Sequence, residues 1–162
     1  MEEHALLAVD RDGALAFFVQ ELEDVSGRAV DRDELLYNAS VLAHYAQVST
    51  VTTQDLPAPA DLSAVFDTFV TNTTAPFDSM LLETAGAQCL LLTGFFEDQL
   101  RRRHSIAWYA RLGAGYFSRA ATRQASARKA HLLEMLAVHF EPWRQRHARL
   151  GRELRRRPQR YC

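Results

Sequence analysis

Apolar residues at spacings of three and four recur through most of this 162-residue chain. Because an α-helix turns once every 3.6 residues, this spacing places apolar side chains on one face of a helix. The stretches that show the pattern are 15–25, 31–46, 62–70, 79–92, 106–121 and about 124–157. They predict an all-α chain in which residues 1–162 form a single-domain helical bundle of about five to seven helices.

Short polar signals predict where the first three helices begin and end. Gly27 follows the first apolar pattern and should end that helix. Asp31 and Glu34 have the spacing of a capping box at the start of the second helix. Residues 49–60 (STVTTQDLPAPA) are polar and contain prolines, which predicts a connection. The third helix should follow Asp61 and end at the sequence TNTTAP.

Two helices are predicted to form the centre of the bundle. The stretch Ser79–Leu92 is apolar on nearly all sides, as is typical of a buried helix. Gly94 should end it, and Phe95–Arg103 should form a further short helical piece. Ser105 is then predicted to cap a helix over Ile106–Ala121. These two long helices form the expected central apolar pair.

The Ile106–Ala121 helix should have two different faces. One face carries the residues expected in the core: Ile106, Tyr109, Ala110, Gly113, Tyr116, Phe117 and Ala120. The opposite face carries Trp108, Arg111, Leu112, Gly115 and Arg119. Since this second face would leave a tryptophan in water, we expect it to contact a partner. Trp and Arg often anchor protein interfaces, and a glycine lets two backbones approach, so we predict a homodimer contact here.

The last helical region is predicted to be basic and interrupted. Leu132, Leu133, Leu136 and Phe140 should face the core, together with a hydrogen-bonded His139. Pro142 should bend the helix or split it in two. From about residue 144 the chain should continue as a basic helical or frayed tail.

The charges of this chain are divided between its two ends. Residues 1–99 contain 17 Asp and Glu against three Arg, whereas residues 100–162 contain three acids against 15 Arg and one Lys. Acidic early helices that pack beside basic late helices would explain this division, and we favour that interpretation. Alternatively, the basic end binds nucleic acid or another polyanion through Arg101, Arg102, Arg103, Arg144, Arg146 and Arg149.

The sequence AVDRDGAL near the N-terminus resembles the D-x-D-G-T-L signature of the haloacid dehalogenase superfamily. The resemblance implies a magnesium-dependent phosphotransferase in which a strand delivers Asp10 as the nucleophile and Asp12 as the acid-base residue. Ala14 stands where the signature has threonine, and the late acidic pair of that superfamily is missing. A turn or helix cap is the simpler explanation of these aspartates.

Other features of the sequence narrow the function classes further. The two cysteines suggest no disulfide framework, and Cys89 is predicted to be a small buried residue. We expect no metal or cofactor, no leader segment and no membrane span, and therefore a cytoplasmic protein. The preference for arginine over lysine, with abundant alanine, suggests a bacterial coding bias. The predicted function is a non-enzymatic interaction or regulatory protein whose partner is a second copy or another protein.

Overall fold

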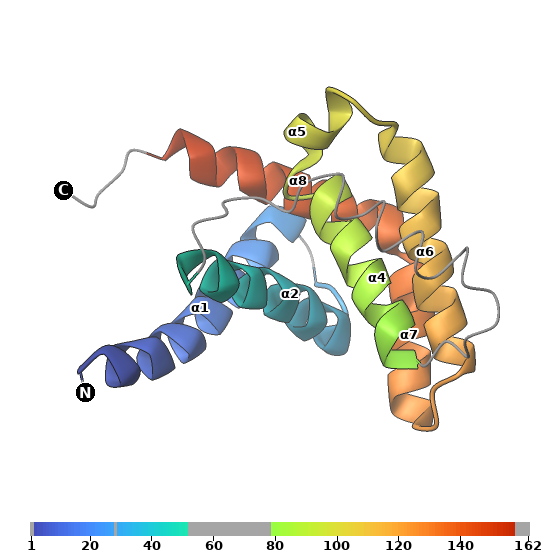
Figure 1. The fold of residues 1–162 in the computed structure, drawn as a ribbon, viewed down its shortest axis with the longest axis horizontal. Coiled ribbons are helices and arrows are strands. Elements are labelled where there is room, and N and C mark those ends of the chain that lie inside the picture. The colour runs from blue at the N-terminus through green and yellow to red at the C-terminus, as the bar shows by residue number, and fades with distance from the viewer. Residues whose placement is uncertain (1, 28, 52–78, 158–162) are drawn as a thin grey trace. The chain divides into compact units, whose positions relative to one another are not determined.

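The computed structural model describes residues 2–27, 29–51 and 79–157, with side chains for 13–27, 29–46 and 79–157. All regular secondary structure in these ranges is helical, which confirms the all-α prediction. The helices are α1 (Glu2–Ser26), α2 (Arg32–Val51), α4 (Ser79–Thr93), α5 (Glu97–Arg101), α6 (Ile106–Thr122), α7 (Ala127–Val138) and α8 (Phe140–Arg156), as Figure 1 shows. The helix predicted over 62–70 and most of the connection predicted over 49–60 lie outside the described residues.

The chain divides into two compact units, of which the first contains α1 and α2. These two helices pack against each other, and Gly27 ends α1 with a φ of 67°, as predicted. The amide of Glu34 donates to Asp31 Oδ2 at 3.0 Å, so Asp31 caps α2 as the sequence indicates. α2 continues to Val51, which places the first residues of the predicted 49–60 connection inside a helix.

The start of α1 differs from the sequence prediction. The helix begins at Glu2, well before residue 15, and it includes Asp10 and Asp12. The intervening residues are rich in Ala, Leu and Glu, which have high helix propensities, and this explains the earlier start. The strand that the phosphotransferase resemblance requires before Asp10 is therefore a helix, and the aspartates lie neither in a turn nor at a cap.

The first unit buries the predicted faces of its two helices. From α1 these are Phe18, Leu22 and Val25, and from α2 they are Leu35, Ala39, Leu42 and Ala43. Leu36, which the apolar pattern includes, lies at the edge of the buried face of α2 and is 36% exposed. Asn38 is fully buried, and its Nδ2 donates to the Glu34 carbonyl oxygen at 2.8 Å. This bond satisfies a polar group that would otherwise destabilise the core.

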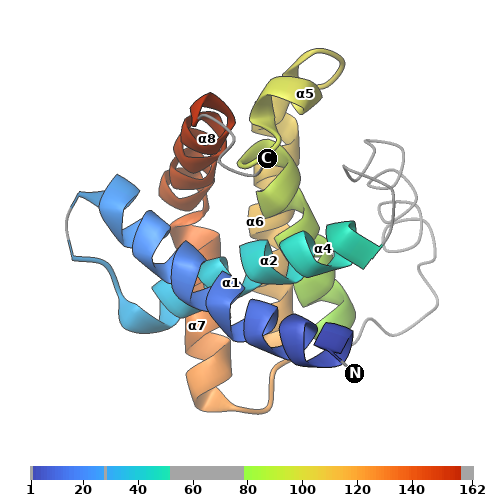
Figure 2. The same cartoon turned by 90° about the vertical axis from the view of Figure 1, so that its left-hand side faces the viewer.

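The second unit contains α4 to α8, and its most extensive contact is between α4 and α6. These helices run antiparallel side by side, with α5 near one end of both, as Figures 1 and 2 show. Ser79 Oγ at the start of α4 donates to the Ala120 carbonyl oxygen near the end of α6 at 2.9 Å. The predicted central helix pair is therefore present within this unit.

Two glycines allow the helices of the second unit to approach closely. A Cβ atom at Gly113 of α6 would lie only 2.6 Å from Cys89 Cβ and from the ring of Phe140. A Cβ atom at Gly86 of α4 would meet the ring of Phe117 at 3.0 Å. The notch that the sequence places at Gly113 is filled by side chains from α4 and α8.

The predicted last helix is split into α7 and α8, with the break at His139. Pro142 lies in the first turn of α8, where its missing N–H would have no acceptor within the helix. His139 is only half-buried because it forms this break, so the prediction of a core histidine at this position is wrong. The histidine of the core is His147, which is completely buried.

The basic sequence after residue 144 is part of the packed structure up to the end of α8. Leu150 is fully buried and Gly151 is buried, although eight of the seventeen residues from Arg144 to Arg160 are arginines. A Cβ atom at Gly151 would lie 2.8 Å from the Phe95 carbonyl oxygen. This close contact brings α8 against the turn between α4 and α5.

Candidate functional site

The orientation of α6 is fixed by its cap and by its buried aromatic residues. Ser105 Oγ accepts the amide of Trp108 at 3.2 Å, as expected for an N-cap residue. Tyr109, Tyr116 and Phe117 are buried, so they hold one side of the helix against its neighbours. The opposite side of α6 must therefore face outward.

We call the outward side of α6 the α6 stripe, defined by Trp108, Arg111, Leu112, Gly115 and Arg119. Trp108 is 43% exposed, while Arg111, Gly115 and Arg119 are also exposed and Leu112 is half-buried. No atom lies within 4 Å of a Cβ atom built at Gly115. The structure thus places the predicted interface residues on one accessible face, and their contact with a partner remains a prediction.

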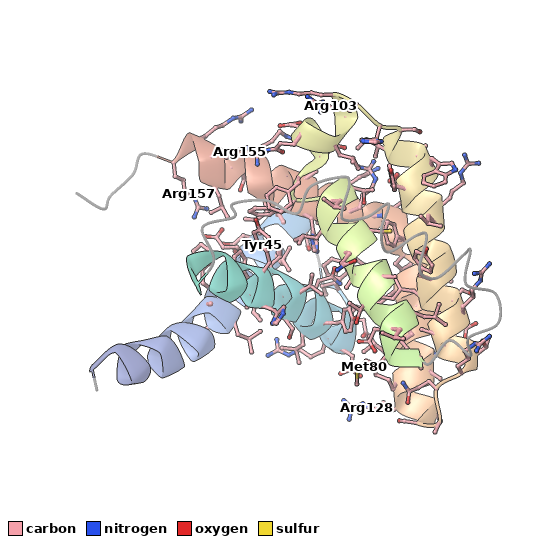
Figure 3. All side chains as sticks on the ribbon, viewed as in Figure 1. Tyr45, Met80, Arg103, Arg128, Arg155 and Arg157 are labelled. Carbon is pink, nitrogen blue, oxygen red and sulfur yellow. The ribbon has the colours of Figure 1, made fainter. Side chains whose placement is uncertain are left out.

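The sequence around the α6 stripe is free of acidic residues. From Gln99 to Leu133 the chain has no Asp or Glu but has seven arginines and Lys129. Figure 3 shows Arg103 on the turn near α5 and Arg128 near the start of α7, on the segments that precede and follow α6 in the chain. The stripe itself contains Arg111 and Arg119 and no carboxylate.

A different cationic region, on α8, is partly neutralised by a buried carboxylate. Glu97 of α5 is buried, and its carboxylate oxygens lie 2.6 Å from Arg144 Nη1 and 3.0 Å from Arg152 Nη1. Arg101 Nη2 lies 3.1 Å from the same group. Three guanidinium groups thus surround one carboxylate, and we call these four residues the Glu97 cluster. Buried charges of this kind require partners, which explains the arrangement.

Arg144 is the most enclosed arginine of this cluster, with a side chain that is 11% exposed. It also contacts Glu141 through Nε at 2.6 Å and donates to the Thr93 carbonyl oxygen at 3.2 Å. Burial alone would lower its pKa, but the hydrogen bonds and charges of Glu141 and Glu97 outweigh burial and raise it. Arg144 therefore stays positively charged, and its hydrogen bond to Thr93 connects α8 to the end of α4.

The α5 helix is held against α8 at a second point. Arg155 Nη2 lies 3.2 Å from Asp98, and its Nη1 lies 3.5 Å from the Phe95 carbonyl oxygen. A Cβ atom at Gly94 would lie 2.6 Å from His147 Cβ, so the α4–α5 turn fits directly against α8. The ion pair of Arg155 and the close packing at Gly94 therefore hold the same short segment, the α4–α5 turn with α5, against α8.

The six arginines predicted to bind a polyanion differ in their contacts within the chain. Arg101 and Arg144 belong to the Glu97 cluster, Arg146 lies 4.6 Å from the centre of the Trp143 ring, and Arg149 lies 3.5 Å from Glu153. Arg102 and Arg103 are exposed. Arg101 and Arg149 are exposed as well, whereas Arg144 and Arg146 are half-buried, and binding of a polyanion by these six residues remains a prediction.

Three buried titratable groups of the second unit, in contrast to Glu97, are held in their neutral forms. Burial, and then the charge of Arg146, lowers the pKa of His147 to about 3. Burial raises the pKa of the Cys89 thiol to about 12. The pKa of Tyr116 is raised to about 12, mainly by burial. Because these three groups are enclosed and uncharged near neutral pH, they are poor candidates for acid-base or nucleophilic chemistry.

Sequence reasoning missed Glu97 and His147, although a signal for each existed. Phe140, Trp143, His147 and Leu150 follow the helical spacing, so they extend the core face of α8 into the arginine-rich region. Glu97 lies directly after Phe95 and Phe96. This position next to apolar residues, together with the many arginines later in the chain, was the signal that Glu97 could form a buried ion pair.

Among the residues that the structure describes, no three His, Cys, Asp or Glu side chains are grouped so that they could hold a metal ion. Within the same residues, no helix has the length and apolar character needed to cross a membrane. No protein-family model, curated protein or solved structure matches this chain.

Proposed function

We propose that this chain is a non-enzymatic interaction or regulatory protein, bacterial by its arginine and alanine usage, that forms a homodimer through the α6 stripe. The observation that supports this proposal best is the exposure of Trp108 on a helix whose other aromatic residues are buried. Tryptophan and arginine are the side chains that most often dominate the binding energy of protein interfaces.

The shape of the α6 stripe also supports a protein contact. The open space at Gly115 permits the backbone of a second helix to approach α6 at its midpoint. Trp108 and Leu112 provide apolar surface on one side of this point, and the arginines provide charged groups that can confer specificity. An apolar centre with a polar rim is the usual composition of such interfaces.

The first experiment replaces Trp108 with alanine and measures the mass in solution by light scattering over a range of concentrations. We expect the wild-type chain to dimerise and Trp108→Ala to weaken the dimer at least tenfold, as is typical of an interface hot spot. Val138→Ala is the matched control, because Val138 is an apolar α7 residue that is 64% exposed and lies outside the stripe.

Two results of this experiment would count against the proposal. If the wild-type chain has the mass of one copy at every concentration, the proposed homodimer does not exist. If the wild-type chain is a dimer and Trp108→Ala leaves its dissociation constant unchanged, the contact lies on another surface. Circular dichroism should show the same helix content in both variants and the wild type, since each replaces a side chain that is exposed.

A second candidate function, polyanion binding, is supported by the exposure of Arg102 and Arg103 on the turn after α5. It predicts that single-stranded DNA retains the protein at low salt and that the retention weakens steeply as salt is added. Arg102→Ala with Arg103→Ala should abolish this retention. Truncation near residue 144 is a poor test, because it removes Trp143 or Leu150 from the core. Absence of retention at low salt would eliminate this function.

A further inference from the structure

The only charged residues of the α6 stripe are two arginines, and this constrains what surface it can bind. Residues 106–122 contain Arg111 and Arg119 but no Asp or Glu. These arginines are eight positions apart in the helix, which corresponds to about 12 Å along the axis at a rise of about 1.5 Å per residue. A partner surface must therefore offset two separated positive charges.

Contact between two copies of the stripe does not meet this requirement. Gly115 lies midway between Arg111 and Arg119 in the sequence. If two antiparallel stripes met about a two-fold axis at Gly115, each Arg111 would lie against Arg119 of the other copy. Like charges placed opposite each other across an interface are unfavourable, and the stripe supplies no acid between them.

The chain itself contains an acidic surface of the required charge. Residues 21–34, around the α1–α2 turn, contain six Asp and Glu against two Arg. Glu23, Asp24 and Asp31 are exposed there. We define these three residues as the acidic turn. Asp31 already caps α2, whereas Glu23 and Asp24 end the exposed side of α1.

We propose that the α6 stripe of one copy binds the acidic turn of a second copy, so that the dimer contains two equivalent stripe-to-turn contacts. This inference depends on the homodimer proposed above and adds the identity of the opposing surface. Two copies that exchange both contacts form a closed dimer with a two-fold axis. Charge complementarity of this kind mainly determines register and partner choice, while Trp108 supplies apolar contact area.

Charge-reversed variants test this pairing. The stripe variant carries Arg111→Glu and Arg119→Glu, and the turn variant carries Glu23→Lys and Asp24→Lys. Each reversal involves exposed side chains in long helices, and lysine near the C-terminal end of α1 is compatible with the helix dipole. Each variant alone should dimerise at least tenfold more weakly than the wild type, because every stripe-to-turn contact then joins like charges. Added salt should weaken the wild-type dimer as well.

An equimolar mixture of the two variants provides the decisive measurement. In this mixture each contact again joins opposite charges, so native mass spectrometry should show mixed dimers with an affinity within a few-fold of the wild type. Glu134→Lys on α7 and Arg102→Glu after α5 are the matched controls; both residues are exposed and outside the two surfaces. Neither control should change the dissociation constant of the dimer by more than about twofold.

Each alternative result would overturn the pairing in a recognisable way. If the stripe variant forms mixed dimers with the wild type and the turn variant dimerises normally, then two stripes contact each other. If the mixture of variants stays monomeric, the acidic turn is not the opposing surface. If single-stranded DNA retains the wild type but not the stripe variant, and no dimer forms, then the stripe binds nucleic acid. A monomeric wild type would reject the homodimer itself, which distinguishes that failure from the others.

Discussion

The buried histidine of α8 should make the second unit sensitive to mild acid. His147 has a pKa of about 3 in the folded chain, against an ordinary value of 6.5. Between these two pH values the unfolded chain binds a proton that the folded chain does not bind. The free energy of unfolding therefore decreases as the pH falls below 6.5, and the stabilisation is complete only above that pH.

The size of this effect follows from the difference between the two pKa values. One pKa unit corresponds to about 1.4 kcal/mol. His147 alone should therefore lower the free energy of unfolding by about 2 kcal/mol between pH 8 and pH 5, and by about 5 kcal/mol in the limit near pH 3. The range from pH 6.5 to pH 5 is the most informative, because carboxylates with ordinary pKa values are still mostly ionised there.

Urea unfolding at several pH values from 5 to 8 would measure this effect, with the fluorescence of the buried Trp143 as a reporter. His147→Gln removes the titrating group and should lose most of the dependence on pH in this range, whatever its stability at pH 8. His131→Gln is the matched control, since His131 is an exposed histidine of α7. If His147→Gln and the wild type lose stability equally between pH 8 and pH 5, the reasoning is wrong.

Three further results are expected from the packing and charges of the second unit. Gly94→Ala should destabilise this unit by about 2 kcal/mol or more, because the added Cβ atom meets backbone oxygens at 2.8 and 2.9 Å. Gly115→Ala should instead stabilise α6 by up to about 1 kcal/mol in the absence of a partner, because alanine has a higher helix propensity than glycine. Thermal unfolding would compare the two variants. Glu97→Gln should cost about 2 kcal/mol in urea unfolding, since the enclosed Arg144 then keeps the exposed Glu141 as its acidic partner, while Glu153→Gln at an exposed pair should cost less than about 0.5 kcal/mol. Cys89, buried and with its pKa raised to about 12, should stay unmodified by a thiol reagent at pH 8 until denaturant is added, as peptide mass spectrometry can show.

Helix positions in this chain could be predicted where local signals determine them. Gly27, Asp31 and Ser105 act on residues within one turn of themselves, and each ends or caps a helix as predicted. The core face of α6 could also be predicted, because a helix with a regular apolar stripe has one way to bury it. The start of α1 could not, because residues 2–14 form a helix without an apolar stripe that the pattern would reveal.

The buried charges depend on contacts between residues far apart in the sequence. Glu97 and Arg152 are separated by 55 positions, and no local spacing predicts that they meet. The burial of His147 was not predicted for a related reason. The many arginines of α8 make the sequence of this helix resemble a solvated tail, although the apolar residues of α8 continue the helical pattern. The composition of α8 gives only its average polarity, whereas the burial of a residue depends on the face of the helix that it occupies.

The Glu97 cluster changes how the charge division of the sequence should be interpreted. Arginines of α8 are paired with Glu97 and Asp98, the last two acids before residue 99, so part of the basic end is neutralised within the second unit. The positive charge of the α6 stripe has no such nearby acid in the sequence. A chain whose net charge is only −1 can therefore still contain a helix with two arginines and no acidic residue. Because Trp108 and these arginines are exposed, we expect mutations in the proposed interface to change association with little effect on folding.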